Sequence, residues 1–266
     1  MTVTRASPDR HQAAAGTSEW AVFLDFDGTL VEIADRPDAV VVPADLTATL
    51  RALESRLHGA LAIVTGRPIA TIDEFLVPER FDVAGVHGAE YRLAGRSFGS
   101  GPDDHPELQR CIQELHRRFA SEPGILIEDK GCSVGVHWRL APEAEDIALS
   151  AIREVAAALG PAYRLQHGKA VAEVLPSRAS KGAIIEHYLN DPPYRGRRPI
   201  FAGDDLTDEQ AFAAVEALDG VSIRIGAGPT RARYRVGSPT ALRQLLAQWT
   251  SVPHIAFDGM APADAA

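Results

Sequence analysis

The chain has 266 residues, of which 45% are hydrophobic and 24% charged, as expected of one large globular domain or two smaller ones. Its formal net charge of -9 argues against a nucleic-acid partner, because phosphate contacts need a basic protein surface. A small anionic substrate remains compatible with this charge, since a metal ion and a few local cations can reverse its sign at one site.

Cellular location is predicted from what the sequence lacks. No segment has the apolar core of a signal peptide, and no run approaches the roughly 18 apolar residues of a membrane span. The two cysteines, Cys111 and Cys132, are too few for a disulfide framework and suit a reducing compartment. We therefore expect a cytoplasmic monomer that does not bind membranes.

The apolar run 20–24 leads into Asp25 and Asp27 and is broken by Gly28. Such a run is typical of a strand buried on both faces of a parallel sheet, whose carboxyl end is where ligands bind. The two carboxylates project from the same side of the chain, which predicts a cation between them. A calcium loop is excluded, because Thr and Arg stand where its ligands should be. A plain turn is the alternative, but it would leave Asp25 uncompensated at the end of a buried strand.

Helices and strands alternate on both sides of a long central segment. Before it, the pattern predicts a helix from Asp45, a strand over 60–65, a helix over 68–76 and a strand over 81–86. After it, we expect helices over 181–189, 207–218 and 239–249 and strands over 199–203, 221–225 and 232–236. This alternation predicts an α/β fold with a doubly wound, mostly parallel sheet.

The central segment has a different pattern. A linker over 99–104 precedes two repeats of helix and hairpin, with helices over 106–120 and 142–159 and strands over 124–129, 132–140, 163–166 and 170–175. We place turns at 130–131 and 167–169 and predict an inserted α+β domain with an antiparallel sheet. The predicted division is a flexible arm (1–18), a core (19–100 and 179–252), an inserted domain (101–178) and a frayed tail (253–266).

Four motifs in this order resemble those of the haloacid dehalogenase (HAD) superfamily of phosphatases. The first is Asp25-Phe26-Asp27-Gly28-Thr29; the others are Thr65 at a strand end, Lys181 at a helix start, and the group Asp204, Asp205 and Asp208 after a buried strand. Taken singly, the last three also fit a strand cap, a solvated helix start and a helix N-cap cluster. The resemblance implies a HAD-like core carrying a cap domain of the second type, with Mg²⁺ as cofactor.

The resemblance also implies a role for each of these residues. Asp25 is the nucleophile and, with the backbone oxygen of Asp27 and the carboxylate of Asp204, a metal ligand. Asp27 is the general acid and base. Thr65 and Lys181 stabilise the phosphate, while Asp205 and Asp208 act through water or by orienting Lys181.

The inserted domain resembles the caps of trehalose-6-phosphate phosphatases. The carrying segments are 85–90, 128–131, 137–139, 168–174 and 176–182, within a resemblance that covers about 20–249. This implies hydrolysis of trehalose 6-phosphate through an aspartyl-phosphate, in trehalose biosynthesis. The expected substrate-binding residues are Thr65, Gly66, Arg67, His87, Glu128, Lys130, Arg139, Lys169 and Glu173.

The charged residues of the inserted domain suit a sugar, because alternating carboxylates and cations accept from and donate to many hydroxyls. A set of surface salt bridges, which contribute little, is the alternative. Rival functions are hydrolysis of sucrose or mannosylglycerate phosphate, a phosphomutase, and a non-catalytic sugar-phosphate sensor. The intact motif set argues against the sensor.

Overall fold

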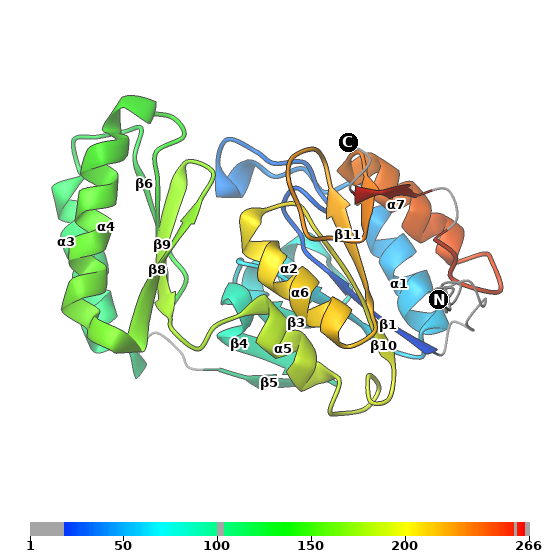
Figure 1. Ribbon diagram of the computed structural model, residues 1–266. Coiled ribbons are helices and arrows are strands. Elements are labelled where there is room, and N and C mark those ends of the chain that lie inside the picture. The colour runs from blue at the N-terminus through cyan, green and yellow to red at the C-terminus, as the bar shows by residue number, and fades with distance from the viewer. Residues whose placement is uncertain (1–18, 100–103, 258–259, 264–266) are drawn as a thin grey trace, which may run out of the picture.

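The computed structural model describes residues 19–99, 104–257 and 260–263. Two sheets organise these residues, one of nine strands and one of four. Figure 1 shows the core around the larger sheet on the right and the inserted domain on the left. The predicted arm 1–18 and residues 100–103 of the predicted linker lie outside the described residues, so the domain limits stay predictions.

The core sheet has the strand order β13-β12-β11-β10-β1-β2-β3-β4-β5. Its strands are β1 (Trp20–Leu24), β2 (Leu61–Val64), β3 (Asp82–Gly85), β4 (Glu90–Leu93), β5 (Arg96–Phe98), β10 (Arg198–Gly203), β11 (Val221–Ile225), β12 (Tyr234–Val236) and β13 (Ala261–Pro262). Neighbours from β12 to β3 run parallel, while β4, β5 and β13 are antiparallel additions at the edges. Val22, Phe23 and Leu24 are fully buried, which agrees with their uninterrupted apolar run. The predicted α/β class is therefore confirmed.

Helices cover both faces of the core sheet (Figure 1). On one face α1 (Leu46–Arg56) packs beside α7 (Pro239–Trp249), and on the other α5 (Lys181–Tyr188) packs beside α6 (Glu209–Ala217). The short helix α2 (Ile69–Phe75) connects β2 to β3. The leucines of α1 that recur every three or four residues are buried, as their spacing predicted.

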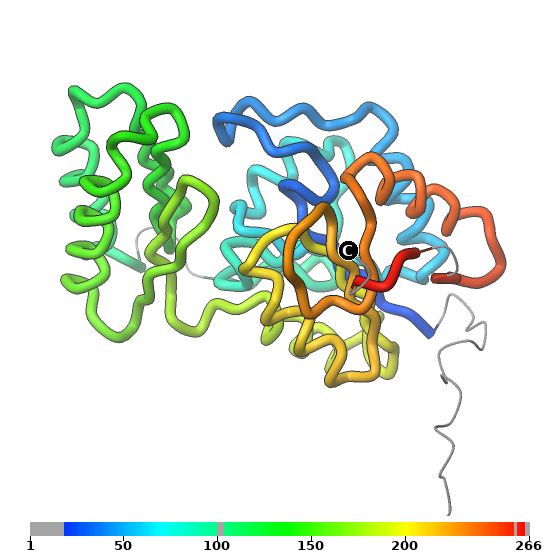
Figure 2. The backbone as a smooth tube through the Cα atoms, turned by 45° about the horizontal axis from the view of Figure 1, so that its top comes forward, coloured from blue at the N-terminus to red at the C-terminus, as the bar shows by residue number. Residues whose placement is uncertain are grey.

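The inserted domain, here called the cap, runs from α3 to β9 and has its own hydrophobic cluster. Its elements are α3 (Pro106–Arg118), β6 (Leu126–Asp129), β7 (Val134–His137), α4 (Glu145–Leu159), β8 (Tyr163–Gly168) and β9 (Val171–Pro176). The strands are all antiparallel, in the order β6-β7-β9-β8. One face of this sheet packs on the two helices, and Figure 2 shows the other face turned toward the core.

One predicted turn of the cap is wrong. We expected it over 167–169, but β8 continues to Gly168, which pairs with Val171. The turn consists of Lys169 and Ala170, and Ala170 has a φ of 60°. A residue other than glycine is uncommon at such a φ, and here it accompanies the two-residue turn between β8 and β9.

The frayed tail from residue 253 is also a wrong prediction for the residues that the structure describes. Ile255 is buried, Phe257 packs edge-on against Trp20 at 5.4 Å between ring centroids, and β13 pairs with β12. The antiparallel strands β4 and β5, which extend the other edge of the sheet, were not predicted at all. At both edges of the core sheet, the segments that pack and pair there have no strong hydrophobic periodicity. The sequence pattern therefore did not predict these strands.

A small apolar cluster joins the cap to the core. It contains Val86 and Ala89 of the core, Cys132 and Leu175 of the cap, and Ala179 of the returning connection. Burial raises the pKa of the Cys132 thiol to about 11, so it stays a neutral core residue. Within the described ranges, no helix is long and apolar enough to cross a membrane.

Candidate active site

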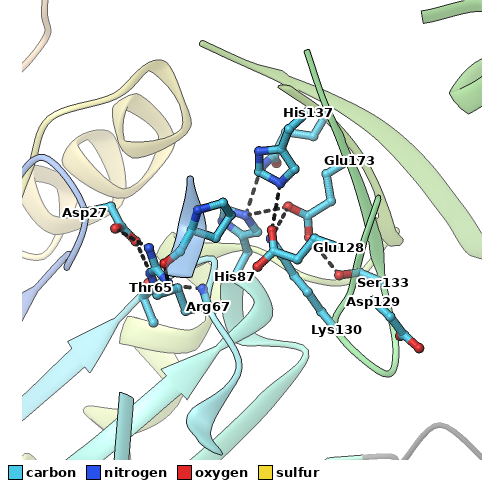
Figure 3. Close-up of polar contacts among 12 residues, drawn as sticks. Asp27, Thr65, Arg67, His87, Glu128, Asp129, Lys130, Ser133, His137 and Glu173 are labelled. Atoms are coloured by element: carbon cyan, nitrogen blue, oxygen red, sulfur yellow. Dashed lines mark hydrogen bonds and ion pairs between the residues drawn. The ribbon is translucent and has the colours of Figure 1, made fainter. Parts of the chain in front are cut away.

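The carboxyl ends of the core strands and the polar face of the cap sheet enclose one cleft. It is lined from the core by the strand-end loops after β1, β2 and β10, and from the cap by β6, β7 and the β8–β9 turn. Figure 3 shows the two sets of side chains facing each other, with His87 between them. The predicted catalytic residues Asp25, Asp27, Thr65 and Lys181 all line this cleft.

Asp25 directly follows β1 and is 5% exposed. Lys181, the first residue of α5, places its Nζ 2.8 Å from Asp25 Oδ1. The Thr29 hydroxyl donates a long hydrogen bond of 3.4 Å to the other carboxylate oxygen. Burial raises the pKa of the Asp25 carboxyl well above its usual value; Lys181 opposes this, while the charges of Asp208 and Asp204 add to it. Asp25 is thus a buried carboxylate held by one cation.

Lys181 bridges two acids, because its Nζ also lies 2.7 Å from Asp208 Oδ1. Burial alone would lower the pKa of the ammonium, but Asp208 and Asp25 hold it well above its usual value. Asp208 is fully buried at the end of a 3-10 turn (Leu206–Asp208), and a Cβ at Gly203 would lie 2.5 Å from its Cγ. The glycine thus makes room for the acid that orients Lys181.

Asp204 completes a group of acids that fits a metal ion. Ligand oxygens of Asp25, Asp204 and Asp208 lie within 4.8 Å of one another, and all three residues are buried. A Cβ at Gly28, whose φ is 73°, would fall 2.3 Å from Asp204 Oδ2, so only glycine leaves space for this carboxylate. Burial raises the pKa of Asp204 to about 6, against the opposing charge of Lys169. Hard carboxylate oxygens gathered in this way suit Mg²⁺.

The structure gives the two remaining acids different surroundings from this group. The carboxylate of Asp27 points to Arg67, with Oδ2 2.6 Å from Nε and Oδ1 2.8 Å from Nη2. Its side chain therefore lies outside the acid group, which agrees with a ligand role confined to the backbone oxygen. Asp205 lines the cleft, and its side chain forms a capping box with Asp208 rather than a bond to Lys181.

Arg67, predicted to bind substrate, lines the cleft, and its guanidinium has several protein partners. Besides Asp27, it donates to the backbone oxygen of Pro37 at 2.8 Å and stacks on the ring of Phe75 at 5.1 Å. Arg67 is 8% exposed overall. Its contacts indicate that it holds Asp27 and the segment after β1 in place.

Thr65, Gly66 and His87 form the floor between core and cap. The Thr65 hydroxyl accepts a hydrogen bond from the backbone N–H of Arg67 at 3.1 Å. His87 lies over Gly66, since a Cβ there would be 2.7 Å from its Nε2. Val86 and His87 both have positive φ, and a β-branched residue in that region is strained. This strained turn brings His87 Nε2 to 3.5 Å from Glu173 of the cap.

The cap presents a network of charged residues to the cleft. Lys130 Nζ lies 2.8 Å from Glu173 Oε2 and 3.8 Å from Glu128 Oε2, and Ser133 donates to Glu173 Oε1 at 2.8 Å. Burial opposes ionisation of Glu173, yet Lys130 and His87 hold the pKa of its carboxyl far below the usual value. Burial likewise opposes ionisation of Glu128, but Lys130 and His137 together lower the pKa of its carboxyl. Both carboxylates are therefore ionised acceptors beside a cation.

The β8–β9 turn brings the cap into contact with the acid group. Lys169 Nζ lies 3.3 Å from Asp204 Oδ2. Arg139, predicted to meet the sugar, also donates to the backbone oxygen of Lys169 at 2.9 Å and so fixes this turn. Arg139 and Lys169 both line the cleft, as do all the predicted substrate-binding residues except Glu173, which lies behind them bonded to Lys130.

Sequence reasoning missed several cleft residues. His137, whose Nε2 lies 2.8 Å from Glu128 Oε2, is the last residue of β7, and its place in the segment 137–139 that carries the family resemblance could have identified it. Ser133, which is buried behind the cleft and donates to Glu173, was also not predicted. The segment Ile33–Pro37, which lines the cleft beside the β8–β9 turn (Figure 2), carried no signal in the sequence.

The core has the doubly wound, mostly parallel sheet of a HAD-like fold, with Asp25, Lys181 and Asp208 in contact beside the carboxyl ends of its strands. A phosphatase of the HAD superfamily from Bacteroides thetaiotaomicron shares the fold, with a TM-score of 0.56 at 15% identity over 94% of this chain and 100% of that one. Within this class, the sequence model of the family described as trehalose-phosphatase matches residues 23–240. The chain belongs to this family.

Individual relatives agree with this assignment. A probable trehalose-phosphate phosphatase of Sinorhizobium fredii is 45% identical over 233 residues, covering 86% of each chain. The trehalose-6-phosphate phosphatase of Escherichia coli K12 is 41% identical over 221 residues, covering 83% of this chain and 82% of its own. A crystal structure of a trehalose-6-phosphate phosphatase related protein has a TM-score of 0.76 at 30% identity and covers 86% of this chain and 96% of that one.

Proposed function

We propose that this protein hydrolyses trehalose 6-phosphate to trehalose and phosphate, with Mg²⁺, in trehalose biosynthesis. Family membership and relatives of that name at 41–45% identity support the substrate. The observation that carries the chemistry is the cleft itself, in which the buried Asp25–Lys181 pair faces the Glu128–Lys130–Glu173 network of the cap. We therefore assign phosphate chemistry to the core wall of the cleft and hydroxyl recognition to its cap wall.

The reaction begins with attack of an Asp25 carboxylate oxygen on phosphorus, which forms an aspartyl-phosphate as the bond to the sugar oxygen breaks. Lys181 and the Thr65 hydroxyl stabilise the equatorial oxygens, where charge accumulates. Asp27 protonates the leaving sugar oxygen and then takes a proton from the attacking water, which releases phosphate. Arg67, bonded to both oxygens of Asp27, keeps that carboxylate at the cleft wall.

The metal would be held by Asp25, Asp204 and the backbone oxygen of Asp27. When bound there, Mg²⁺ neutralises negative charge that the nucleophile and the phosphate bring together. The raised pKa values of Asp25 and Asp204 support a cation in this place, because both carboxyls lack enough positive charge of their own. Asp208 and Asp205 support the group through Lys181 and the capping box.

The sugar would be recognised by the cap. Ionised Glu128 accepts hydrogen bonds from hydroxyls, and Lys130 and the Lys169 ammonium donate them, while Glu173 behind the cleft holds Lys130 in place. A site built from such groups rejects analogues that lack the hydroxyls, because its polar atoms would be left unpaired. Phosphatases of sucrose or mannosylglycerate phosphate and a phosphomutase remain the rivals. We also propose that the enzyme acts in the cytoplasm as a monomer.

The decisive experiment measures phosphate release from a panel of sugar phosphates with Mg²⁺ and with EDTA. We expect kcat/KM for trehalose 6-phosphate to exceed that for glucose 6-phosphate and sucrose 6-phosphate by at least about tenfold. A higher value for another sugar phosphate would contradict the substrate, and undiminished activity in EDTA would contradict the metal. Transfer of phosphate to a sugar acceptor, without release to water, would indicate a phosphomutase.

A further inference from the structure

One row of residues crosses the polar face of the cap sheet. Glu128 of β6 is the register partner of Gly135 of β7, Gly135 is the partner of Glu173 of β9, and Glu173 is the partner of Gln166 of β8. Directly opposite residues project to the same side of a sheet. The row therefore carries two carboxylates and an amide, with no side chain at the position between the carboxylates.

The gap at Gly135 gives the ring of His137 its place. His137 follows Gly135 by two residues and pairs with Leu126, so its contact with Glu128 is diagonal. Its Nε2 nevertheless lies 2.8 Å from Glu128 Oε2. A Cβ at residue 135 would be 3.2 Å from His137 Nε2 and 3.6 Å from Glu128 Oε2. The imidazole thus leans over the glycine to reach the carboxylate, and a larger residue would occupy that path.

The orientation of the Glu128 carboxylate depends mainly on one close partner, His137, whereas that of the Glu173 carboxylate is shared between two. Glu173 has close partners on both oxygens, Lys130 and Ser133, each at 2.8 Å. Lys130 is 3.8 Å from Glu128, beyond hydrogen-bond distance. The Glu128 side chain is also more exposed, at 20% against 8% for Glu173, and it lines the cleft.

We propose that His137 is a positioning residue that holds the Glu128 carboxylate toward the cleft, and that Gly135 is the residue that permits it. Because Glu128 is ionised, the imidazole N–H must be the donor of this hydrogen bond. A carboxylate held in one orientation accepts from a sugar hydroxyl without first losing rotational freedom. The inference rests on the proposed function, since it assumes that Glu128 meets the sugar.

The first test compares His137→Ala and His137→Gln, with His116→Ala on the exposed face of α3 as the matched control. We expect His137→Ala to raise KM for trehalose 6-phosphate about tenfold and to leave p-nitrophenyl phosphate hydrolysis within about twofold of wild type. The Gln variant should recover most of the loss, because its amide can donate to Glu128. Equal losses on both substrates, no loss on either, or a Gln variant no better than Ala would overturn the proposal.

A second test asks whether His137 acts through Glu128. In a Glu128→Gln background, His137→Ala should add less than about a twofold further loss, because the group it positions is already altered. Fully additive losses would mean that His137 contacts the sugar itself, which overturns the positioning role.

Gly135→Val should reproduce the effect of His137→Ala on KM, and Gly135→Ala should have an intermediate effect. A Val variant that keeps the wild-type KM and melting temperature would overturn the role of the glycine.

The wild-type panel separates this inference from the proposed function. If the wild type prefers another sugar phosphate, the proposed substrate is wrong, and the same variants assayed on the preferred substrate still decide the role of His137. If the wild type prefers trehalose 6-phosphate and the variants behave as wild type, only the positioning role fails.

Discussion

Lys169 of the cap lies 3.3 Å from Asp204 of the core, so that a cap cation pairs with an acid of the metal-binding group. The lysine stands in a two-residue turn whose backbone is held by Arg139. Its side chain is 54% exposed, while that of Asp204 is 10% exposed. The cap thus supplies positive charge at the place where a metal ion would act.

This ion pair predicts competition between Lys169 and the metal. Replacing Lys169 by Met should tighten Mg²⁺ binding to the substrate-free protein by roughly threefold or more, because no ammonium has to be displaced from Asp204. Isothermal titration calorimetry measures this, with His167→Ala on the neighbouring exposed residue as the control. Weaker Mg²⁺ binding by the Met variant would contradict the prediction.

Magnesium binding should also depend on pH through Asp204. Its pKa is raised from 3.8 to about 6, so the carboxyl takes up a proton as pH falls through about 6 and loses affinity for a cation. We expect the Mg²⁺ dissociation constant to rise steeply between pH 7 and pH 5. A constant value over this range would mean that Asp204 is ionised throughout or is not a ligand.

The same shift makes a prediction for stability without metal. An acid whose pKa is raised on folding stabilises the protein below its unfolded pKa of 3.8, and this contribution is lost as pH rises through about 6. The melting temperature of Asp204→Asn in EDTA should therefore rise relative to that of wild type as pH increases from 5 to 8. A difference that is independent of pH would show that burial of this charge is already compensated.

Asp25→Asn should abolish turnover while the fold persists. The change is nearly isosteric, but an amide cannot attack phosphorus. Phosphate release should fall below about 1% of wild type, a loss of at least about 2.7 kcal/mol in transition-state stabilisation. Circular dichroism and the melting temperature in EDTA serve as controls for folding. Activity above that level would remove Asp25 from the nucleophile role.

Asp27→Asn should affect substrates unequally. Formation of the phosphoenzyme from a sugar phosphate needs protonation of a poor leaving group, whereas p-nitrophenolate leaves with little help. Single-turnover measurements should show a loss at least about tenfold larger for trehalose 6-phosphate. If the two substrates lose the same factor, Asp27 is not the acid, and its bond to Arg67 is structural.

Glu173→Ala should separate sugar recognition from phosphate chemistry. We expect kcat/KM for trehalose 6-phosphate to fall at least about tenfold, or about 1.4 kcal/mol, with p-nitrophenyl phosphate unchanged. Lys169→Ala should not separate the substrates as cleanly, because Lys169 contacts Asp204 as well as lining the sugar side of the cleft. A parallel fall for Glu173→Ala would assign that residue to the fold or to cap closure.

The sequence alone determined the core of this protein. Apolar runs ending in Asp25, Thr65 and Asp204 predict parallel strands, and the carboxyl ends of parallel strands meet at one edge of a sheet. The antiparallel cap also followed from local pattern, because helix and hairpin signals lie within a few residues of each other. Backbone periodicity and chain order were sufficient for both.

Only the tertiary structure decided how charged residues pair across the cleft. The bonds Arg67–Asp27 and Lys130–Glu173 join residues 40 and 43 positions apart, and His87 meets Glu173 across the two domains. A sequence pattern shows which side of an element a residue occupies, but the pairing of charges depends on how separate elements pack. The contacts of Arg67 with Asp27 and of Arg139 with the Lys169 turn could not be predicted for this reason, because only the folded chain brings these acceptors within reach of the two guanidinium groups.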